Sequence, residues 1–225
     1  MFPAQLQYNH PDGYNQTVPR KRLIEDVDLL AAARRELARS GPARITVEGV
    51  AREAGLAKAT VLQRFGSKHG LMVALARQST LLLRERCAKA LAEPGSPLDA
   101  LANLLSARAG PIEKPVELAN QLAFLPIALG DPEFRSLAVE QAQCARSGIH
   151  KLLSAAVEAG ELAPCDTAKL AKAVYVTYTG ALLTWAVLRE GTVQDWVRSC
   201  LAEALQPYVL RNPAAKSKEA RRGNS

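Results

Sequence analysis

The sequence predicts an all-α protein. Apolar residues recur at three- and four-residue steps along most of the chain, and breaks that contain proline or glycine divide this pattern into helix-length segments. No run of alternating β-branched residues competes with the helical pattern. With 225 residues, of which 48% are hydrophobic and 23% charged, the chain has the composition of a globular protein that is long enough to bury a sizeable core.

The first predicted helix starts near Leu23 and stops at Ser40-Gly41-Pro42, because glycine and proline interrupt the periodic pattern there. Residues 1–19, which precede this helix, show no hydrophobic period. We expect them to form a flexible arm.

Two short helices are predicted after this stop. Thr46 is an expected N-cap for an apolar stripe over residues 47–54, and Gly55 ends the helix. A second short helix is predicted over residues 60–65, and Ser67 is expected to cap the helix that follows it.

The rest of the chain is predicted to form long helices, separated by glycine and proline breaks. Their expected ranges are 68–92, 97–109, 116–129, 133–159, 166–189 and 193–209. After them, residues 211–225 form a basic segment of biased composition, which we expect to be disordered.

The net charge of +7 is concentrated near the two ends of the chain. Residues 20–78 carry 12 basic and 6 acidic side chains, and residues 211–225 carry 5 basic and 1 acidic. Residues 79–210, in contrast, carry 12 basic and 14 acidic side chains. We therefore expect the N-terminal segment, rather than the large middle, to attract a polyanion such as nucleic acid.

Membrane and metal proteins are not indicated. The longest apolar stretches are about half of the ~20 residues that a membrane-spanning helix needs. The first residues lack the features of a secretory signal, so the expected location is cytoplasmic. The four cysteines lie 21 to 57 residues apart, which suits neither a zinc site nor a disulfide scaffold. We expect reduced thiols, no metal and no cofactor.

The motifs of common enzyme classes are also missing. The three histidines are scattered, and there is no phosphate-binding glycine loop, nucleophile elbow or metal-binding helix pattern. We expect the protein not to be an enzyme, although a catalytic set that only folding assembles would leave no such motif.

The two short helices and their glycine-containing turn are typical of a helix-turn-helix, in which the first helix braces the second in the major groove of DNA. Leu56, Val61 and Phe65 are expected to anchor the second helix inward. Gln63 and Arg64 on its outer side are the expected base readers, because glutamine can bond adenine and arginine can bond guanine.

Phosphate contacts are expected where helices begin, because free backbone N–H groups and the helix dipole favour an anion there. Thr46 and Lys68 occupy such positions. The full set of predicted DNA-binding residues is Arg44, Thr46, Lys58, Ala59, Thr60, Gln63, Arg64 and Lys68.

Several spaced positions agree with one known family: Thr46, Val50-Ala51, Ala54-Gly55, Lys58, Thr60, Phe65 and Ser67-Lys68. Through them, the segment from Gly41 to Leu71 resembles the DNA-binding domain of TetR-type transcriptional regulators. Three positions depart from the family pattern: Pro42 replaces an aromatic residue, Ala57 a serine cap, and Leu62 a frequent tyrosine that touches the DNA backbone.

The resemblance implies a three-helix DNA-binding domain over residues 20–68 and a helical ligand-binding and dimerisation domain over residues 69–210. It implies a homodimer in which the last two helices pair across the interface and a ligand pocket controls the spacing of the DNA-reading heads. We expect a ligand-responsive, sequence-specific transcriptional regulator. It is expected to be a repressor that binds a palindromic operator in double-stranded DNA and is released from it by a small-molecule inducer.

Two sets of residues in the larger domain are binding candidates. Residues that combine polarity or aromaticity with expected burial are candidates for the ligand pocket: Gln121, Phe124, His150, Tyr175 and Trp185. The helix over 166–189 is apolar on more than one face, as expected of a helix that a second subunit covers. The candidate dimer residues are Tyr178, Leu182, Trp196, Cys200 and Leu201.

Alternatives stay open at this point. Ordinary core packing is the better explanation of each pocket candidate, the helix over 166–189 could be internal to a monomer, and the arm and tail either touch DNA or only solubilise the chain. The alternative function is a DNA-architectural protein without ligand control. Such a protein inserts apolar side chains into the minor groove, whereas the apolar residues near the basic segment are needed inward.

Overall fold

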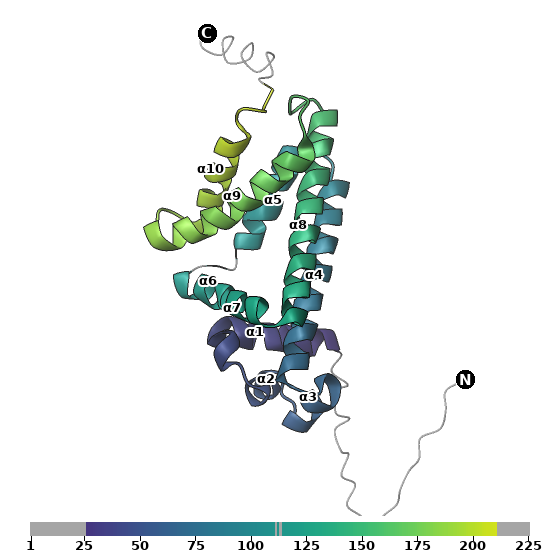
Figure 1. Cartoon of the computed structure of the whole chain (residues 1–225), viewed down its shortest axis with the longest axis vertical. Coiled ribbons are helices and arrows are strands. Elements are labelled where there is room, and N and C mark those ends of the chain that lie inside the picture. Colours follow the sequence, from purple (N-terminus) through teal and green to yellow (C-terminus); the bar gives the residue numbers. More distant parts are fainter. Residues whose placement is uncertain (1–25, 111, 113, 211–225) are drawn as a thin grey trace, which may run out of the picture.

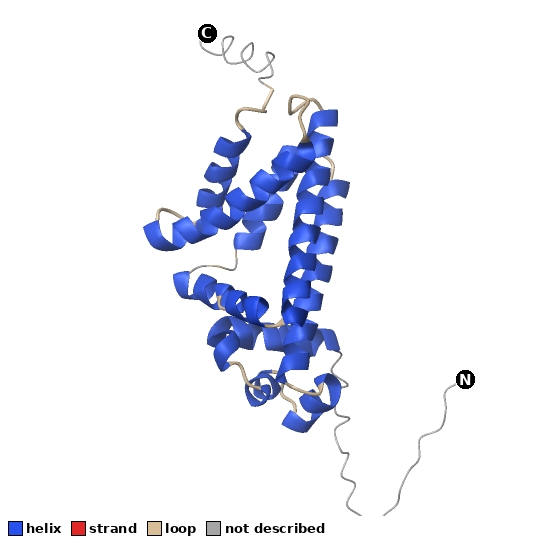
Figure 2. Cartoon of the chain, viewed as in Figure 1, coloured by secondary structure: helices blue, strands red, loops and turns tan. Residues whose placement is uncertain are grey.

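The computed structural model describes residues 26–110, 112 and 114–210, so the predicted arm over 1–19 and the predicted tail over 211–225 lie outside the described residues. Figure 2 shows that the described part is built from helices and loops. The helices are α1 (Asp26–Arg44), α2 (Val47–Glu53), α3 (Lys58–Phe65), α4 (Lys68–Ala92), α5 (Pro97–Ala109), α6 (Pro115–Leu122), α7 (Phe124–Gly130), α8 (Pro132–Glu158), α9 (Thr167–Leu188) and α10 (Val193–Leu205). The all-α prediction is confirmed.

Helices α1, α2 and α3 form a small unit, here called the head, at one end of the molecule (Figure 1). Helices α9 and α10 lie toward the opposite end, and the long helices α4 and α8 run side by side between the two ends. Helices α6 and α7 cover α1 on the side that faces the larger domain. Because α4 begins at the head and continues into the larger domain, one rigid element joins the two.

Among the described residues, two large hydrophobic cores and a small cluster of Leu83, Cys87 and Ala145 hold this arrangement together. The core of the head contains Leu29, Val50 and Val61, but it also takes in Leu71 of α4 and Phe134 of α8. The second core lies among α5, α6, α8, α9 and α10 and includes fully buried leucines of α5 and α8. The first turns of α4 and α8 therefore belong energetically to the head as well as to the larger domain.

The short helices are capped as the sequence predicts. The Thr46 hydroxyl accepts a hydrogen bond from the N–H of Gly49 at 3.0 Å, and the Ser67 hydroxyl accepts one from Gly70 at 3.0 Å. Helix α3 starts at Lys58, two residues earlier than expected, and Ala57 provides no side-chain cap. The backbone of α3 is therefore fixed by its neighbours rather than by its own cap.

Helix α1 breaks where glycine and proline predict it. Gly41 has φ 73° and ψ 165°, a conformation that is not helical, and one further turn then runs to Arg44. A side chain at this position would be strained, because L residues rarely adopt such a φ. The predicted stop is correct, and the turn after it is an addition that the sequence pattern did not indicate.

The single helix predicted over 116–129 is wrong, because α6 and α7 are separated at Ala123. Pro126 has no N–H to donate to the carbonyl four residues earlier, so a continuous helix would lose a hydrogen bond there. In the structure Pro126 lies in the first turn of α7, where no such bond is needed. The last helix is also shorter than predicted, since the chain turns after Leu205 and Val209 forms an isolated bridge with Leu162.

Within the described ranges, no helix is both long enough and apolar enough to cross a membrane.

Candidate functional site

Helix α3 is anchored on one side and open on the other. Val61 is 1% exposed, and Leu56 and Phe65 pack partly buried against the same core. Ala59 and Gln63 are exposed on the opposite side. The inward anchors and the outward position of Gln63 are therefore as the sequence predicted.

The positively charged side chains around α3 also make contacts within the chain. The Lys58 ammonium pairs with the Glu48 carboxylate of α2, and Lys68 donates to the carbonyl of Ala43 at 3.1 Å. Thr46, Lys58 and Lys68 are exposed and mark the starts of α2, α3 and α4. Three helix N-termini, which carry free N–H groups, thus lie in consecutive packed helices, namely α2 and α3 of the head and α4.

Arg44 lies close to this group and is exposed. Its Nε donates to the carbonyl of Ser40 at 3.1 Å, across the break in α1. Thr60 is only half-buried, so it stays reachable from outside.

Arg64 lies differently from the expected base reader. Its guanidinium pairs with Asp26 at the start of α1 at 2.9 Å, and its side chain is only 24% exposed. To reach a base edge, Arg64 would have to exchange this partner for DNA. The structure thus places Gln63 outward and Arg64 on the flank of α3 that faces α1.

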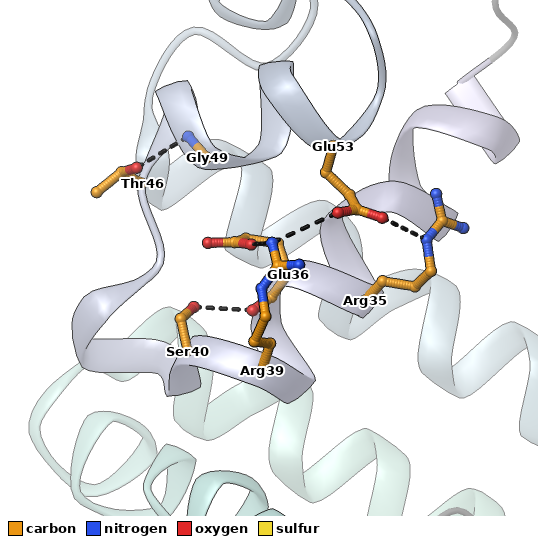
Figure 3. A network of polar contacts seen from close by, with 7 residues as sticks. All are labelled: Arg35, Glu36, Arg39, Ser40, Thr46, Gly49 and Glu53. Atoms are coloured by element: carbon orange, nitrogen blue, oxygen red, sulfur yellow. Dashed lines mark hydrogen bonds and ion pairs between the residues drawn. The ribbon is translucent and has the colours of Figure 1, made fainter.

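An ionic network fastens α2 to α1 (Figure 3). Nε of Arg35 donates to the Glu53 carboxylate at 2.7 Å, and Arg39 reaches both Glu53, at 3.4 Å, and Glu36. The hydrogen bond from Arg35 lowers the pKa of the Glu53 carboxyl below its usual value. A Cβ atom on Gly49 would lie 2.7 Å from the buried Glu36 carboxylate, so glycine permits this close approach. The two helices behind α3 are therefore held in one orientation.

Polar contacts also connect the head to the larger domain. Nε2 of His69, in the first turn of α4, lies 3.1 Å from Asp131, which caps α8. About two turns further along α4, Arg77 pairs with Glu133 at 3.3 Å. Most of these groups are exposed, so solvent screens each pair and its contribution to stability is small.

A second connection runs through α6. Nδ2 of Asn120 donates to the carbonyl of Ala38 at 3.0 Å, directly before the break in α1. A Cβ atom on Gly41 would lie 2.6 Å from the Asn120 amide oxygen, so α6 and α1 approach closely here. Movements of α4, α8 or α6 would all reach the head through these contacts.

A small cavity lies among α4, α5, α8 and α9, and as it stands it has room for about one water molecule. Its lining is mostly apolar, and Arg108 is the charged residue in it. The lining residues are Leu83, Cys87, Leu104, Leu105, Arg108, Ala145, Ile149, Tyr175 and Tyr178. Arg108 and Tyr178 lie near each other in this lining. Burial raises the pKa of Tyr178, and the nearby positive charge of Arg108 acts against this rise.

Of the predicted pocket residues whose side chains the structure describes, Tyr175 alone lines this cavity. Phe124 packs against the core of the head instead, and Nε1 of Trp185 donates to the carbonyl of Gly191 at 3.2 Å, which fastens the loop after α9. Nδ1 of His150 is buried and has no hydrogen-bond partner in the described part of the chain. The predicted role of Gln121 concerns a side chain outside the described structure.

Sequence reasoning missed Arg108. The residue follows Leu101, Leu104 and Leu105 at helical spacing and therefore shares their apolar face of α5. A charged residue on an otherwise apolar stripe was the signal that could have found it.

The predicted dimer residues differ in their exposure within a single chain. Tyr178, Leu182 and Leu201 are 5%, 9% and 2% exposed, because α9 and α10 pack these side chains into their own core. Trp196 and Cys200 are half-buried. Three side chains of this set thus contribute to the core of their own chain.

Another side of α9 is both apolar and open. Val176, Leu183 and Val187 are 61%, 44% and 80% exposed, and Gly180 lies between them at helical spacing. These four residues form one stripe along the helix, here called the α9 stripe. This stripe is the apolar surface that the last two helices present to solvent in the chain by itself.

Two models of protein families match the chain. The model described as bacterial regulatory proteins, tetR family, matches residues 29–75. The model described as the C-terminal part of BetI-type transcriptional repressors matches residues 97–209. No curated protein matches the sequence significantly.

Solved structures of regulators share the fold at low sequence identity. SmeT, the repressor of the multidrug efflux pump SmeDEF of Stenotrophomonas maltophilia, is 19% identical with a TM-score of 0.63, covering 84% of this chain and 93% of its own. A putative transcriptional regulator from Saccharomonospora viridis in complex with choline is 20% identical with a TM-score of 0.69, covering 82% and 97%. FadR of Bacillus subtilis in complex with stearoyl-CoA is 18% identical with a TM-score of 0.62, covering 80% and 97%.

Proposed function

The chain belongs to the TetR family of bacterial regulatory proteins, and from this membership we propose that it is a repressor that binds a palindromic operator as a homodimer and leaves it when a small-molecule inducer binds the larger domain. The observation that carries the proposal is the exposed side of α3, with Gln63 outward and Val61 anchored in the core of the head. A helix held in this way fits the major groove of DNA.

Ligand control is supported by the neighbours in fold. Among the similar structures, one was solved with choline, one with stearoyl-CoA, and SmeT also with triclosan. These ligands differ in charge and size, so they support a ligand-responsive regulator without indicating which inducer this chain binds.

Release would follow from movement of α4. Leu83 and Cys87 of this helix line the cavity, and its first residue, Lys68, lies next to α3. The two heads of a dimer must match half-sites about one helical turn of DNA apart, so a shift of a few ångströms in the heads costs most of the affinity. Coupling of this kind is reciprocal, and operator DNA must weaken inducer binding by the same factor.

Selection of bound duplexes from a random pool at moderate salt tests DNA recognition. We expect a palindromic sequence to win, because a symmetric dimer reads two equivalent half-sites. Binding with little sequence preference would favour the architectural alternative, and an absence of binding would contradict the proposal.

Gln63 and Lys68 are expected to affect DNA binding in different ways. Gln63→Ala should change which base is preferred at one position of each half-site, by about 1–3 kcal/mol. Lys68→Ala should weaken all duplexes alike and reduce the slope of log affinity against log salt by about 0.9, as expected for one lost phosphate contact. Fluorescence anisotropy with the selected duplex and its single-base variants, over a salt series, measures both effects.

Asp26 is expected to restrain Arg64. Asp26→Asn removes the carboxylate that pairs with Arg64, and it also removes a negative charge from the DNA-facing end of the molecule. We expect tighter DNA binding, by about 2- to 10-fold at low salt, because the charge-assisted bond of Arg64 becomes available to DNA. Asp28→Asn, an exposed change in the same turn of α1, is the matched control for charge alone. Equal effects of the two changes would show that Arg64 takes no part.

A further inference from the structure

The cavity among α4, α5, α8 and α9 contains one group that its apolar walls do not explain. Arg108 is half-buried there, near the Tyr178 hydroxyl. Among the ion pairs of the described residues, none includes Arg108. A guanidinium that is partly withdrawn from water and faces no carboxylate has an unmet capacity to bind an anion.

The surrounding charges point in the same direction. Among the described residues, no aspartate or glutamate lines the cavity. Burial raises the pKa of the Cys87 thiol, and the positive charges of Arg108 and of Lys151 on α8 act against this rise. Arg108 is thus the charged group of a lining that is otherwise mostly aliphatic and aromatic.

We propose that this cavity is the inducer site and that the inducer is an amphipathic carboxylate. The carboxylate accepts hydrogen bonds from Arg108 and from the Tyr178 hydroxyl, and the apolar body lies against Leu83 and Ile149. The assignment of the cavity to an inducer rests on the function proposed above, whereas the preference for an anion rests on the lining residues.

A cationic ligand is the chemical opposite and fits the cavity less well. Tyr175 and Tyr178 offer aromatic faces of the kind that bind quaternary ammonium groups. The same cavity, however, holds the charge of Arg108, which repels a cation at short range, and its described lining residues include no carboxylate to balance it.

The size of the cavity links binding to regulation. Because it now holds about one water molecule, an inducer can enter only if the four helices move apart. A ligand that binds the widened state better than the narrow one shifts the population toward the widened state. Since α4 forms part of the wall, this shift reaches the head directly.

The experiment uses the full chain and three probes with the same alkyl body: octanoate, octanol and octyltrimethylammonium. Binding is measured by isothermal titration calorimetry near neutral pH, where octanoate is ionised, in the absence of DNA. We expect octanoate to bind more than about tenfold tighter than octanol, since hydrogen bonds to a charged partner are about twice as strong as neutral ones. Octyltrimethylammonium is expected to bind most weakly.

Variants assign this preference to Arg108. Arg108→Gln should abolish the advantage of octanoate over octanol, and Tyr178→Phe should reduce it in part. Arg146→Gln, which changes an exposed arginine of α8, should leave the advantage unchanged. Thermal melts of each variant establish that it is folded, and Arg108→Lys, which keeps the charge, should retain part of the advantage if Arg108→Gln proves unstable.

Three results would overturn the proposal: equal binding of octanoate and octanol, tighter binding of octyltrimethylammonium, or no binding of any probe. Release of DNA is measured separately, by anisotropy of the selected duplex with and without octanoate. Arg108-dependent binding of octanoate that leaves DNA affinity unchanged would uphold the anion site and contradict its role in induction.

Discussion

Leu183→Asp is expected to convert the protein into a monomer and to lower its affinity for a palindromic duplex by more than about 100-fold. Leu183 lies in the middle of the α9 stripe and is 44% exposed in the single chain. An interface on this stripe would bury the new carboxylate without a partner, which costs several kcal/mol. Loss of the dimer removes the second head, and two linked binding sites exceed either one alone by about 10²- to 10⁴-fold.

Analytical ultracentrifugation of the variant at micromolar concentration checks the first part, with 24.2 kDa as the mass of one chain. Anisotropy with the palindromic duplex and with a single half-site checks the second part, because a monomer should bind both with similar affinity. Val139→Asp is the matched control, since Val139 is 48% exposed on α8, outside the α9 stripe. A Leu183→Asp protein that remained dimeric would show that the stripe is not the interface.

The sequence predicted the existence and order of the helices because each signal was local. Thr46 and Ser67 cap helices through atoms three residues away, and Gly41 breaks α1 through its own backbone. The predictions that failed depend on which other helices pack against a segment, and the periodic pattern of one segment does not contain this information. The interruption at Ala123 also had a local signal in Pro126, but the apolar period continues across it and concealed the break.

The two apolar sides of α9 illustrate a different failure. Tyr178 and Leu183 are five residues apart, so they point in directions that differ by about 140°. The pattern correctly indicated that both sides are apolar. It did not indicate that Tyr178 faces the core of its own chain and Leu183 faces solvent, because this depends on where α8 and α10 pack.

The candidate pocket was the least predictable part. Aromatic and polar residues with expected burial serve core and pocket alike, and Phe124 and Trp185 proved to pack in cores. What distinguishes the cavity is Arg108, a charge that meets no carboxylate among the described lining residues. The lining is formed by four helices together, so no single helix could reveal this.

Gly70→Ala is expected to destabilise the head by about 3 kcal/mol, in the range for overpacking against atoms that cannot move aside. A Cβ atom at Gly70 would lie 2.1 Å from the backbone carbonyl oxygen of Phe65, the last residue of α3. The clash involves main chain rather than a flexible side chain, so α4 must shift relative to α3. The shift also moves Gln63, and we expect DNA affinity to fall even at temperatures where the variant is folded.

The expected loss of stability in Gly70→Ala is informative because it is opposite in sign to the usual effect of this substitution. Alanine normally stabilises a helix relative to glycine by about 0.5–1 kcal/mol. Gly130→Ala at the end of α7 is the control, since a Cβ atom there meets nothing within 4 Å. In urea unfolding, the free energy of unfolding of Gly70→Ala should be lower than that of the parent protein, and that of Gly130→Ala should be equal or higher.

Octanoate binding in the cavity should survive in a folded Gly70→Ala protein, because the clash lies in the first turn of α4 and the part of α4 that lines the cavity lies more than three turns later. A Gly70→Ala protein as stable as its parent would mean that the turn between α3 and α4 adapts, and that the position of α3 is not fixed by this contact.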